Sequence, residues 1–304
     1  MKITYQNKKK RILLELLSIS IGIFGVCLFF IGGGFSSMLP ASVEVTETTT
    51  TVTTTAPTTT TTTLPAPTTS TTAAANHDSV KNESVHIDNV APRRRVYLTF
   101  DDGPSKLTKD FLAVLKKHKV HGTFFVIDTK YDHELDNIFR SGHVIGLHSA
   151  SHDYKDIYES TKSFWKDMDK IADIVKENTG QDAEIIRFPG GGSNTVSRKY
   201  SEGIMQRLVA QSEKRGLVYF DWNCDSGDTW FENGKPFSEK KILKNIKESV
   251  EKREDDIILL MHDRYDMTNT LEALPKIIKY FKKQGFVFDV LTKDTPPVRH
   301  KVVN

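Results

Sequence analysis

Two histidines at metal-ligand spacing, His148 and His152, are the residues of this chain best suited to hold a metal ion. At positions i and i+4 of one helical turn, both imidazoles would face the same way. Two histidines and one carboxylate, with a position left open for water, make a catalytic site of the zinc type. These ligands also accept cobalt or nickel. In isolation, the pair is slightly more typical of solvated or capping histidines, which are common near strand ends.

A pair of carboxylates, Asp101 and Asp102, supplies acidic groups for such a site. The pair follows the apolar run 96–100 and precedes Gly103-Pro104, which forces a tight turn. Alone, this pattern is ordinary turn chemistry. Because the aspartates and the histidines each come directly after an expected strand, they can converge at one end of a parallel sheet. Together they are typical of a metal-dependent hydrolase.

A third histidine, His262, ends the apolar run 256–261. A lone histidine at a strand end is often only a satisfied core residue. Asp225 lies just past the preceding expected strand, and its carboxylate could hold the imidazole in one tautomer and raise its pKa. His262 and the aspartate pair together then fit an acid and a base.

Arg187 closes another expected strand, just before Pro189 and the glycines 190–192. A buried arginine at this position needs a carboxylate, and Asp101 is the natural candidate. The glycine run exposes backbone N–H groups that could receive a developing oxyanion. Without the other motifs, the same run could be a flexible loop.

Short β-rich runs alternate with helical stretches from residue 96 onward. Strands are expected at 96–100, 123–127, 144–147, 184–188, 218–222, 257–261 and 286–291. Helices are expected at 106–117, 134–141, 162–179, 197–215, 238–252 and 269–284. Such alternation predicts parallel strands joined by crossover helices. We expect an α/β fold, a deformed (β/α) barrel of about seven parallel strands, with an open doubly wound sheet as the alternative.

The first third of the chain has a different character. A basic tail, 1–11, precedes an apolar segment, 12–35, that is long enough to cross a bilayer as a helix. The positive-inside rule places the tail in the cytoplasm and the rest outside. An anchor of this kind would keep the domain near the cell wall. A cleaved signal peptide, which would release the protein, is the alternative. We therefore expect an exported domain tethered to the cell membrane by a single N-terminal helix.

Residues 36–94 are rich in threonine and proline and have little to bury, so we expect a disordered linker. The folded domain is then 95–304. A disulfide cannot stabilise this domain, because the chain has only two cysteines and one of them, Cys27, lies in the apolar segment. The net charge of +3 and the absence of a basic stripe with interleaved aromatics argue against nucleic acid as a partner.

Five segments of the chain resemble, in order and spacing, the motifs of the polysaccharide deacetylases of carbohydrate esterase family 4, the NodB-homology domain. The resemblance covers about residues 95–295. The matching segments are Thr99–Pro104, His148–His152, Arg187–Gly190, Asp225–Asp228 and Leu260–His262.

The resemblance implies a deformed (β/α) barrel and a role for each matched residue. Asp102, His148 and His152 would hold one divalent ion, zinc in the first place, with cobalt or nickel as alternatives. Asp101 would be the base that takes a proton from the metal-held water, and His262 the acid that protonates the departing amine.

The remaining matched positions would support these groups. Arg187 would orient Asp101, and Asp225 would orient His262. The N–H of Gly190 would meet the oxyanion, and Leu260 would line the pocket for the acetyl methyl group.

The chain departs from the family pattern at two places. Many relatives have an aromatic residue where Gly190 stands, so a side-chain contact with the sugar is lost here. The segment Asp228-Thr229-Trp230 has one residue more than the usual Asp-Trp pair. Either Trp222 or Trp230 could therefore wall the acetyl pocket.

The resemblance and the expected tether together imply an enzyme that removes acetyl groups from N-acetylglucosamine in peptidoglycan. Chitin, acetylated xylan, muramic residues and secondary wall polysaccharides are alternative substrates. A carbohydrate-binding module that has lost turnover should lack a metal ligand, Asp101 or His262, yet all are present. A surface adhesin, in which the threonine-rich segment is the functional part, is a third hypothesis.

Overall fold

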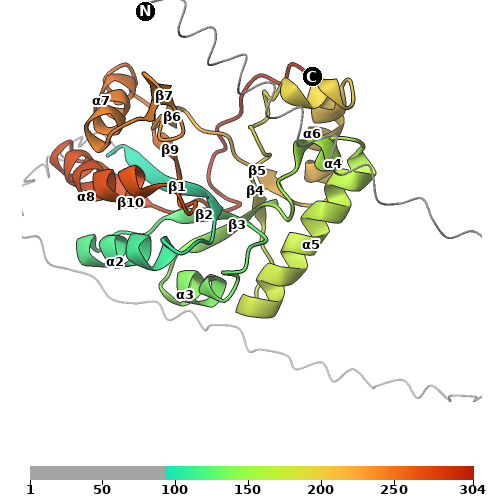
Figure 1. Ribbon diagram of the computed structural model, residues 1–304, viewed down its shortest axis with the longest axis horizontal. Helices are drawn as coiled ribbons and strands as arrows, with labels where there is room; N and C mark the ends of the chain where they lie inside the picture. Colours follow the sequence, from blue (N-terminus) through green and yellow to red (C-terminus); the bar gives the residue numbers. More distant parts are fainter. Residues whose placement is uncertain (1–92) are drawn as a thin grey trace, which may run out of the picture. The chain divides into compact units, whose positions relative to one another are not determined.

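The computed structural model describes residues 93–304 (Figure 1). The predicted tail 1–11, the apolar segment 12–35 and all but the last two residues of the predicted linker 36–94 lie outside this range. No helix within 93–304 is both long and apolar enough to span a bilayer.

The described domain is built on one parallel sheet. Its strands are β1 (Arg95–Gly103), β2 (Thr123–Ile127), β3 (Val144–Ser149), β4 (Ile185–Ile186), β5 (Val218–Tyr219), β6 (Cys224–Asp225), β9 (Ile257–His262) and β10 (Val287–Asp289). Seven of them follow the order β5-β4-β3-β2-β1-β9-β6, and β10 pairs with the start of β1. Every pairing in this sheet is parallel, as the strand-helix alternation predicts.

All seven expected strands are present, and two features were not expected. The short strand β6 forms directly after the expected strand 218–222, of which only Val218–Tyr219 pairs as β5. A separate antiparallel pair, β7 (Phe231–Glu232) and β8 (Lys235–Pro236), precedes α7.

Helices cover the outside of the sheet (Figure 1). They are α2 (Thr108–His118), α3 (Glu134–Arg140), α4 (Tyr154–Ile157), α5 (Thr161–Thr179), α6 (Ile204–Lys214), α7 (Glu239–Val250) and α8 (Thr268–Lys283), with a 3-10 turn η1 (Val196–Lys199). Contacts link them in the order α7, α8, α2, α3, α5 and α6. A doubly wound sheet would divide its helices between two faces, so this single arc excludes that alternative and supports a curved half-barrel.

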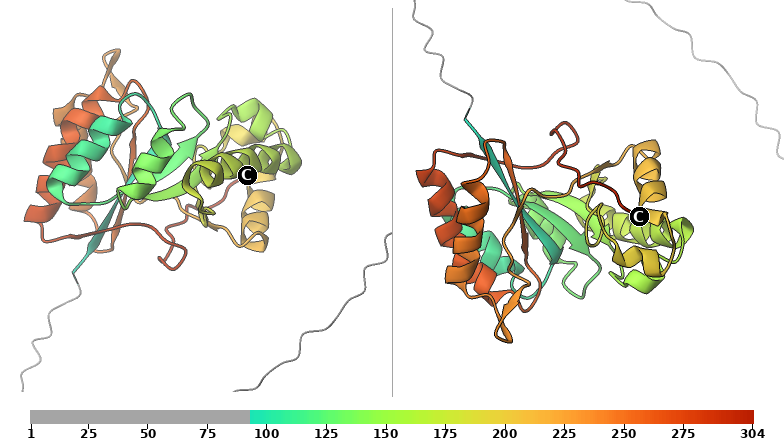
Figure 2. Two further views of the ribbon diagram at one scale, coloured as in Figure 1. Left: turned by 90° about the horizontal axis from the view of Figure 1, so that it is seen from below. Right: turned by 90° about the horizontal axis from the view of Figure 1, so that it is seen from above.

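The sheet does not close into a full barrel. Its end strands, β5 and β6, are not paired with each other. A segment following β10 lies along this edge instead: the N–H of Asp221 donates to the carbonyl of Val298 at 2.9 Å, and the N–H of His300 donates to Asp221 Oδ2 at 2.7 Å. Figure 2 shows this segment crossing from the α8 side of the domain toward α6.

The α5 helix illustrates how local sequence fixes an element. Ser160 caps its start by accepting a hydrogen bond from the N–H of Ser163, and Gly180 ends it with a φ of 73°. Its buried residues recur every three or four positions, so one face packs on the domain core. This packing fixes the helix against β3, which carries one of the candidate metal ligands.

The register of the two central strands brings chemistry-bearing residues together. Asp101 of β1 stands opposite His262 of β9, and Thr99 stands opposite Leu260. Between Arg95 and Asp101 the residues of β1 are buried and, apart from Thr99, apolar, as expected for a central parallel strand. The ionisable side chains of Asp101 and His262 therefore appear together at the carboxyl ends of the two strands.

Candidate active site

The turn after β1 presents two buried carboxylates. Asp101 is only 3% exposed and Asp102 only 7%. Asp102 has a φ of 69°, a left-handed conformation that is unusual for a residue other than glycine. Such backbone strain gathers at functional sites when the surrounding structure enforces it.

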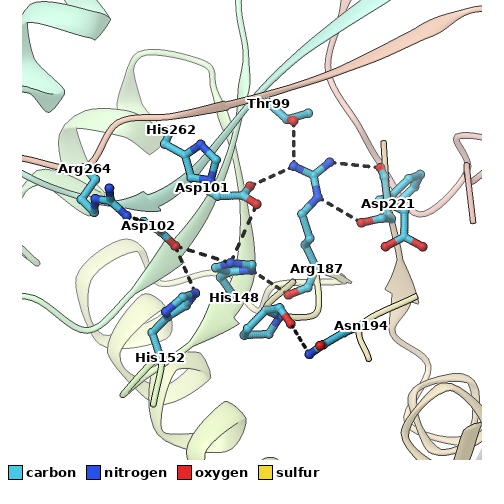
Figure 3. Close-up of polar contacts among 12 residues, drawn as sticks. Thr99, Asp101, Asp102, His148, His152, Arg187, Asn194, Asp221, His262 and Arg264 are labelled. Atoms are coloured by element: carbon cyan, nitrogen blue, oxygen red, sulfur yellow. Dashed lines mark hydrogen bonds and ion pairs between the residues drawn. The ribbon is translucent and has the colours of Figure 1, made fainter. Parts of the chain in front are cut away.

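Asp102, His148 and His152 form a cluster suited to a metal ion (Figure 3). Asp102 Oδ1 lies 3.5 Å from His148 Nε2 and 3.3 Å from His152 Nε2. This oxygen is buried and has no hydrogen-bond partner. A buried carboxylate oxygen without a partner is costly, and a divalent cation bound between it and the two imidazoles would satisfy it. The three residues therefore fit a divalent metal ion, as expected from the sequence.

The tautomer of His148 is set by the backbone. Its Nδ1 lies 2.8 Å from the carbonyl oxygen of Arg187, which can only accept, so Nδ1 carries the proton and Nε2 is left as a ligand. Burial, and then the neighbouring His152, lower the pKa of His148 to about 3. The imidazole is therefore neutral, as metal binding requires.

The two histidines do not lie on one helical turn, which corrects the expectation from their spacing. His148 belongs to β3, and His152 follows in a loop with a φ of 51°, before α4 begins. Asp167 of α5 holds this loop by accepting from Ser149 Oγ at 2.6 Å and from the N–H of Ala150 at 2.6 Å. A strand end and a braced loop, rather than a helix, bring the imidazoles together.

Arg187 and Asp101 form a buried ion pair, the contact that the sequence predicts. Arg187 Nη1 donates to Asp101 Oδ1 at 2.8 Å and to Thr99 Oγ1 at 2.7 Å. The guanidinium also donates to the carbonyls of Phe220, at 3.0 Å, and Asp221, at 3.2 Å. Arg187 is fully buried, so the pair is shielded from water and fixed in one geometry.

The partner of His262 is Asp228, not Asp225 as the sequence suggested. Asp228 Oδ1 lies 2.9 Å from His262 Nδ1, and Asp228 Oδ2 accepts from the His262 N–H at 2.8 Å. Asp225 Oδ1 accepts instead from the N–H of Gly227 at 2.7 Å. Gly227 has a φ of 71°, and the tight turn it allows carries Asp228 back to the end of β9.

The Arg187–Asp101 pair and the Asp228–His262 pair place their ionisable groups in different electrostatic environments. Burial raises the pKa of Asp101, and the charge and hydrogen bond of Arg187 oppose that effect. Burial disfavours charged His262, but the negative charge and hydrogen bond of Asp228 raise its pKa to about 9. Asp228 itself has a lowered pKa because, although burial works against its charge, His262 stabilises the carboxylate. A carboxyl group and an imidazolium thus lie near one metal-type cluster, an arrangement suited to acid-base hydrolysis.

The four predicted substrate-contacting residues differ in exposure. Gly190 is exposed with a φ of 77°, and its N–H donates to no acceptor within the described domain. Leu260 is buried in β9 beside Asp225 of β6. Trp222 packs against the ring of His300, with 4.8 Å between centroids, whereas Trp230 is 47% exposed.

Besides Asp167, sequence reasoning missed three further residues around the site. Tyr154 packs on His152 with 5.6 Å between ring centroids, Arg264 pairs with Asp102, and Asp263 lies buried behind the β1 turn. Both Arg264 and Asp263 directly follow His262, so their place in the sequence could have drawn attention to them. Tyr154 stands two residues after His152 and could have been found in the same way.

The chain is similar to proteins of known family along most of the described domain. A family model described as polysaccharide deacetylase matches residues 88–206. A putative polysaccharide deacetylase of Bacillus subtilis is 32% identical over 67% of this chain and 70% of its own length. A peptidoglycan-N-acetylglucosamine deacetylase of Bacillus cereus is 30% identical over 68% of this chain and 72% of its own length.

A solved structure shares both fold and sequence with the domain. The catalytic domain of a peptidoglycan N-acetylglucosamine deacetylase from Eubacterium rectale matches with a TM-score of 0.66 and 39% identity. The match covers 76% of this chain and 99% of that domain.

Proposed function

This chain belongs to the polysaccharide deacetylases of carbohydrate esterase family 4, hydrolases that act on amide bonds, and we propose that it removes acetyl groups from N-acetylglucosamine in peptidoglycan. The observation that carries the proposal is that two side chains suited to acid-base chemistry, each oriented by a partner, lie next to each other at the ends of β1 and β9. Arg187 holds Asp101, and Asp228 holds His262, on strands whose register sets Asp101 opposite His262.

Asp101 acts as the general base in this proposal. It takes a proton from the water that adds to the acetyl carbonyl, and burial supports this role because it raises the carboxylate's affinity for a proton. Arg187 fixes the rotamer of Asp101 through Oδ1, which leaves Oδ2 available for the proton.

His262 acts as the general acid. Since its pKa is raised to about 9, the ring is protonated at neutral pH. Nδ1–H donates to Asp228, so Nε2 carries the proton that passes to the amine nitrogen as the C–N bond breaks. The products are an amino sugar and acetate.

Asp102, His148 and His152 would hold a divalent metal ion, for which we propose zinc, with cobalt or nickel as alternatives. Such an ion, when bound, would polarise the acetyl carbonyl and lower the pKa of water. Gly190 lies in a backbone turn with a φ of 77°, and its N–H would donate to the developing oxyanion.

The names of two similar proteins, both peptidoglycan-N-acetylglucosamine deacetylases, support peptidoglycan as the proposed substrate. We extend the proposal to the protein's location. The sequence of 1–94 favours a single N-terminal membrane helix and a linker, with the domain outside the cell at its wall. Protease added to intact spheroplasts should digest the domain, whereas a cytoplasmic domain would be protected.

Acetate release from purified peptidoglycan by the full chain tests the function. We expect release that stops after chelation and returns with added zinc or cobalt, and no release by Asp101→Asn. Release from chitin oligomers or acetylated xylan, but not from peptidoglycan, would retain the chemistry and reject the proposed substrate. Metal binding without acetate release from any of these polymers would instead favour a carbohydrate-binding module.

A further inference from the structure

The two oxygens of the Asp102 carboxylate have different surroundings (Figure 3). Oδ1 faces His148 and His152 and has no hydrogen-bond partner. Oδ2 lies on the other side, 3.5 Å from Nη1 of Arg264. The carboxylate is therefore held between a cation on one side and the candidate metal position on the other.

Arg264 is itself held in place. Its Nε donates to Asp266 Oδ1 at 2.7 Å, and its Nη2 donates to Asp266 Oδ2 at 3.2 Å. This two-point contact orients the planar guanidinium and leaves Nη1 directed at Asp102. The negative charge of Asp266 also partly offsets the positive charge of Arg264. Arg264 therefore repels a nearby divalent cation less strongly.

The loop that carries Arg264 is anchored to the turn that carries Asp102. The N–H of Asp263 donates to the carbonyl of Asp101 at 3.2 Å, and Ser105 Oγ donates to the carbonyl of Asp263 at 2.6 Å. Thr108 Oγ1 donates to Asp263 Oδ2 at 2.8 Å. Because these contacts link the two backbones, Arg264 approaches Asp102 from a fixed position.

We propose that Arg264, oriented by Asp266, positions Asp102 for metal binding. By occupying Oδ2, the guanidinium keeps the carboxylate in the rotamer that turns Oδ1 toward the two histidines. Partners that orient a ligand in this way typically change metal affinity about 10–100-fold. Arg264 is thus a positioning residue that acts through Asp102, and its contribution does not depend on which polymer the enzyme deacetylates.

Metal affinity is the direct readout. Zinc binding to the full chain, measured by competition with a fluorescent chelator, should weaken about 10–100-fold in Arg264→Gln. Arg140→Gln is the matched control, since Arg140 forms a similar exposed pair with Asp136 at 2.7 Å, on a helix away from the cluster. Its zinc affinity should equal that of the unchanged protein.

A double-mutant cycle tests whether Asp266 works through Arg264. Asp266→Asn alone should weaken zinc binding, but it should have no further effect when Arg264 is already glutamine. The melting temperature of the metal-free protein should be unchanged in Asp266→Asn and in Arg140→Gln, because exposed ion pairs contribute little to stability.

Two results would overturn the proposal. One is an Arg264→Gln variant that binds zinc as tightly as the Arg140→Gln control. The other is an effect of Asp266→Asn that persists undiminished in the Arg264→Gln background. Both readouts are independent of acetate release, so failure of the proposed substrate would leave this inference standing.

Discussion

Asp228 contacts His262 at two points, one on the ring and one on the backbone. Its Oδ1 lies 2.9 Å from Nδ1, and its Oδ2 accepts from the His262 N–H at 2.8 Å and from Thr270 Oγ1 at 2.9 Å. The carboxylate is buried, and so cannot turn toward solvent. Asp228 therefore fixes both the orientation of the imidazole and the nitrogen that holds its transferable proton.

The pH dependence of activity should follow His262. Its folded-state pKa lies near 9, above the ordinary value, so the acid form persists below that pH and is lost as pH rises through it. We expect kcat/KM to fall above about pH 9. In Asp228→Asn this basic limb should move down by about one to three pH units, since a neighbouring negative charge is lost, and kcat should fall about 10²–10⁴-fold.

The matched control is Asp225→Asn. Asp225 accepts from Gly227 and does not contact the imidazole, so the basic limb should stay in place. A basic limb that moved in Asp225→Asn and stayed fixed in Asp228→Asn would restore the assignment first suggested by the sequence.

Removal of the buried guanidinium should destabilise the fold. In Arg187→Met, Asp101 is left buried without its ion-pair partner, which typically costs about 3–5 kcal/mol of unfolding free energy. Burial already raises the folded-state pKa of Asp101 above its ordinary value, so the ionised carboxylate weakens the folded state and its protonation relieves the cost. The loss should therefore shrink as pH falls.

Urea denaturation at a series of pH values checks this expectation. The double variant Arg187→Met with Asp101→Asn should lose less stability than the sum of the two single changes. Strict additivity at neutral pH would mean that the two side chains are not energetically coupled.

The close contact between Gly103 and Asp263 should make a methyl group intolerable. A Cβ at Gly103 would lie 2.0 Å from Asp263 Oδ1, so Gly103→Ala must displace the loop or the turn. We expect a loss of about 1–3 kcal/mol in unfolding free energy. The additional change Asp263→Ala removes the obstructing carboxylate and should recover part of the lost unfolding free energy. No recovery in the double variant would place the clash elsewhere.

Loss of a residue that binds the metal directly should weaken metal binding more than loss of a residue, such as Arg264, that only orients a ligand. Asp102→Asn should weaken zinc affinity by more than the roughly 100-fold upper range for outer partners. Calorimetric titration of the metal-free protein with zinc measures this. Unchanged affinity in Asp102→Asn would exclude Asp102 from the ligand set.

The sequence carried enough information to predict the parallel sheet and the convergence of its polar strand ends. Asp101, His148, Arg187 and His262 each come at or directly after the end of a strand, and apolar runs mark those ends clearly. The contact between Arg187 and Asp101 followed because a buried guanidinium requires an anionic partner.

The partner of His262 could not be found by the same reasoning. Distance along the chain from an expected strand favoured Asp225, but the strand there is interrupted and resumes as β6. The left-handed turn at Gly227 then decides which carboxylate reaches β9. Asp167 was missed for a related reason, since its contacts with the β3 loop depend on how α5 packs, which the spacing of apolar residues does not specify.

The pairing of β1 with β9 has a consequence for how activity arises during folding. Thr99 Oγ1 donates to the carbonyl of Leu259 although 160 positions separate the two residues. Contacts between such distant segments form late, because the entropy of closing a long loop opposes them. We therefore expect Asp101 and His262 to come together late in folding. Recovery of turnover in a refolding experiment is therefore a report on the final docking of these strands.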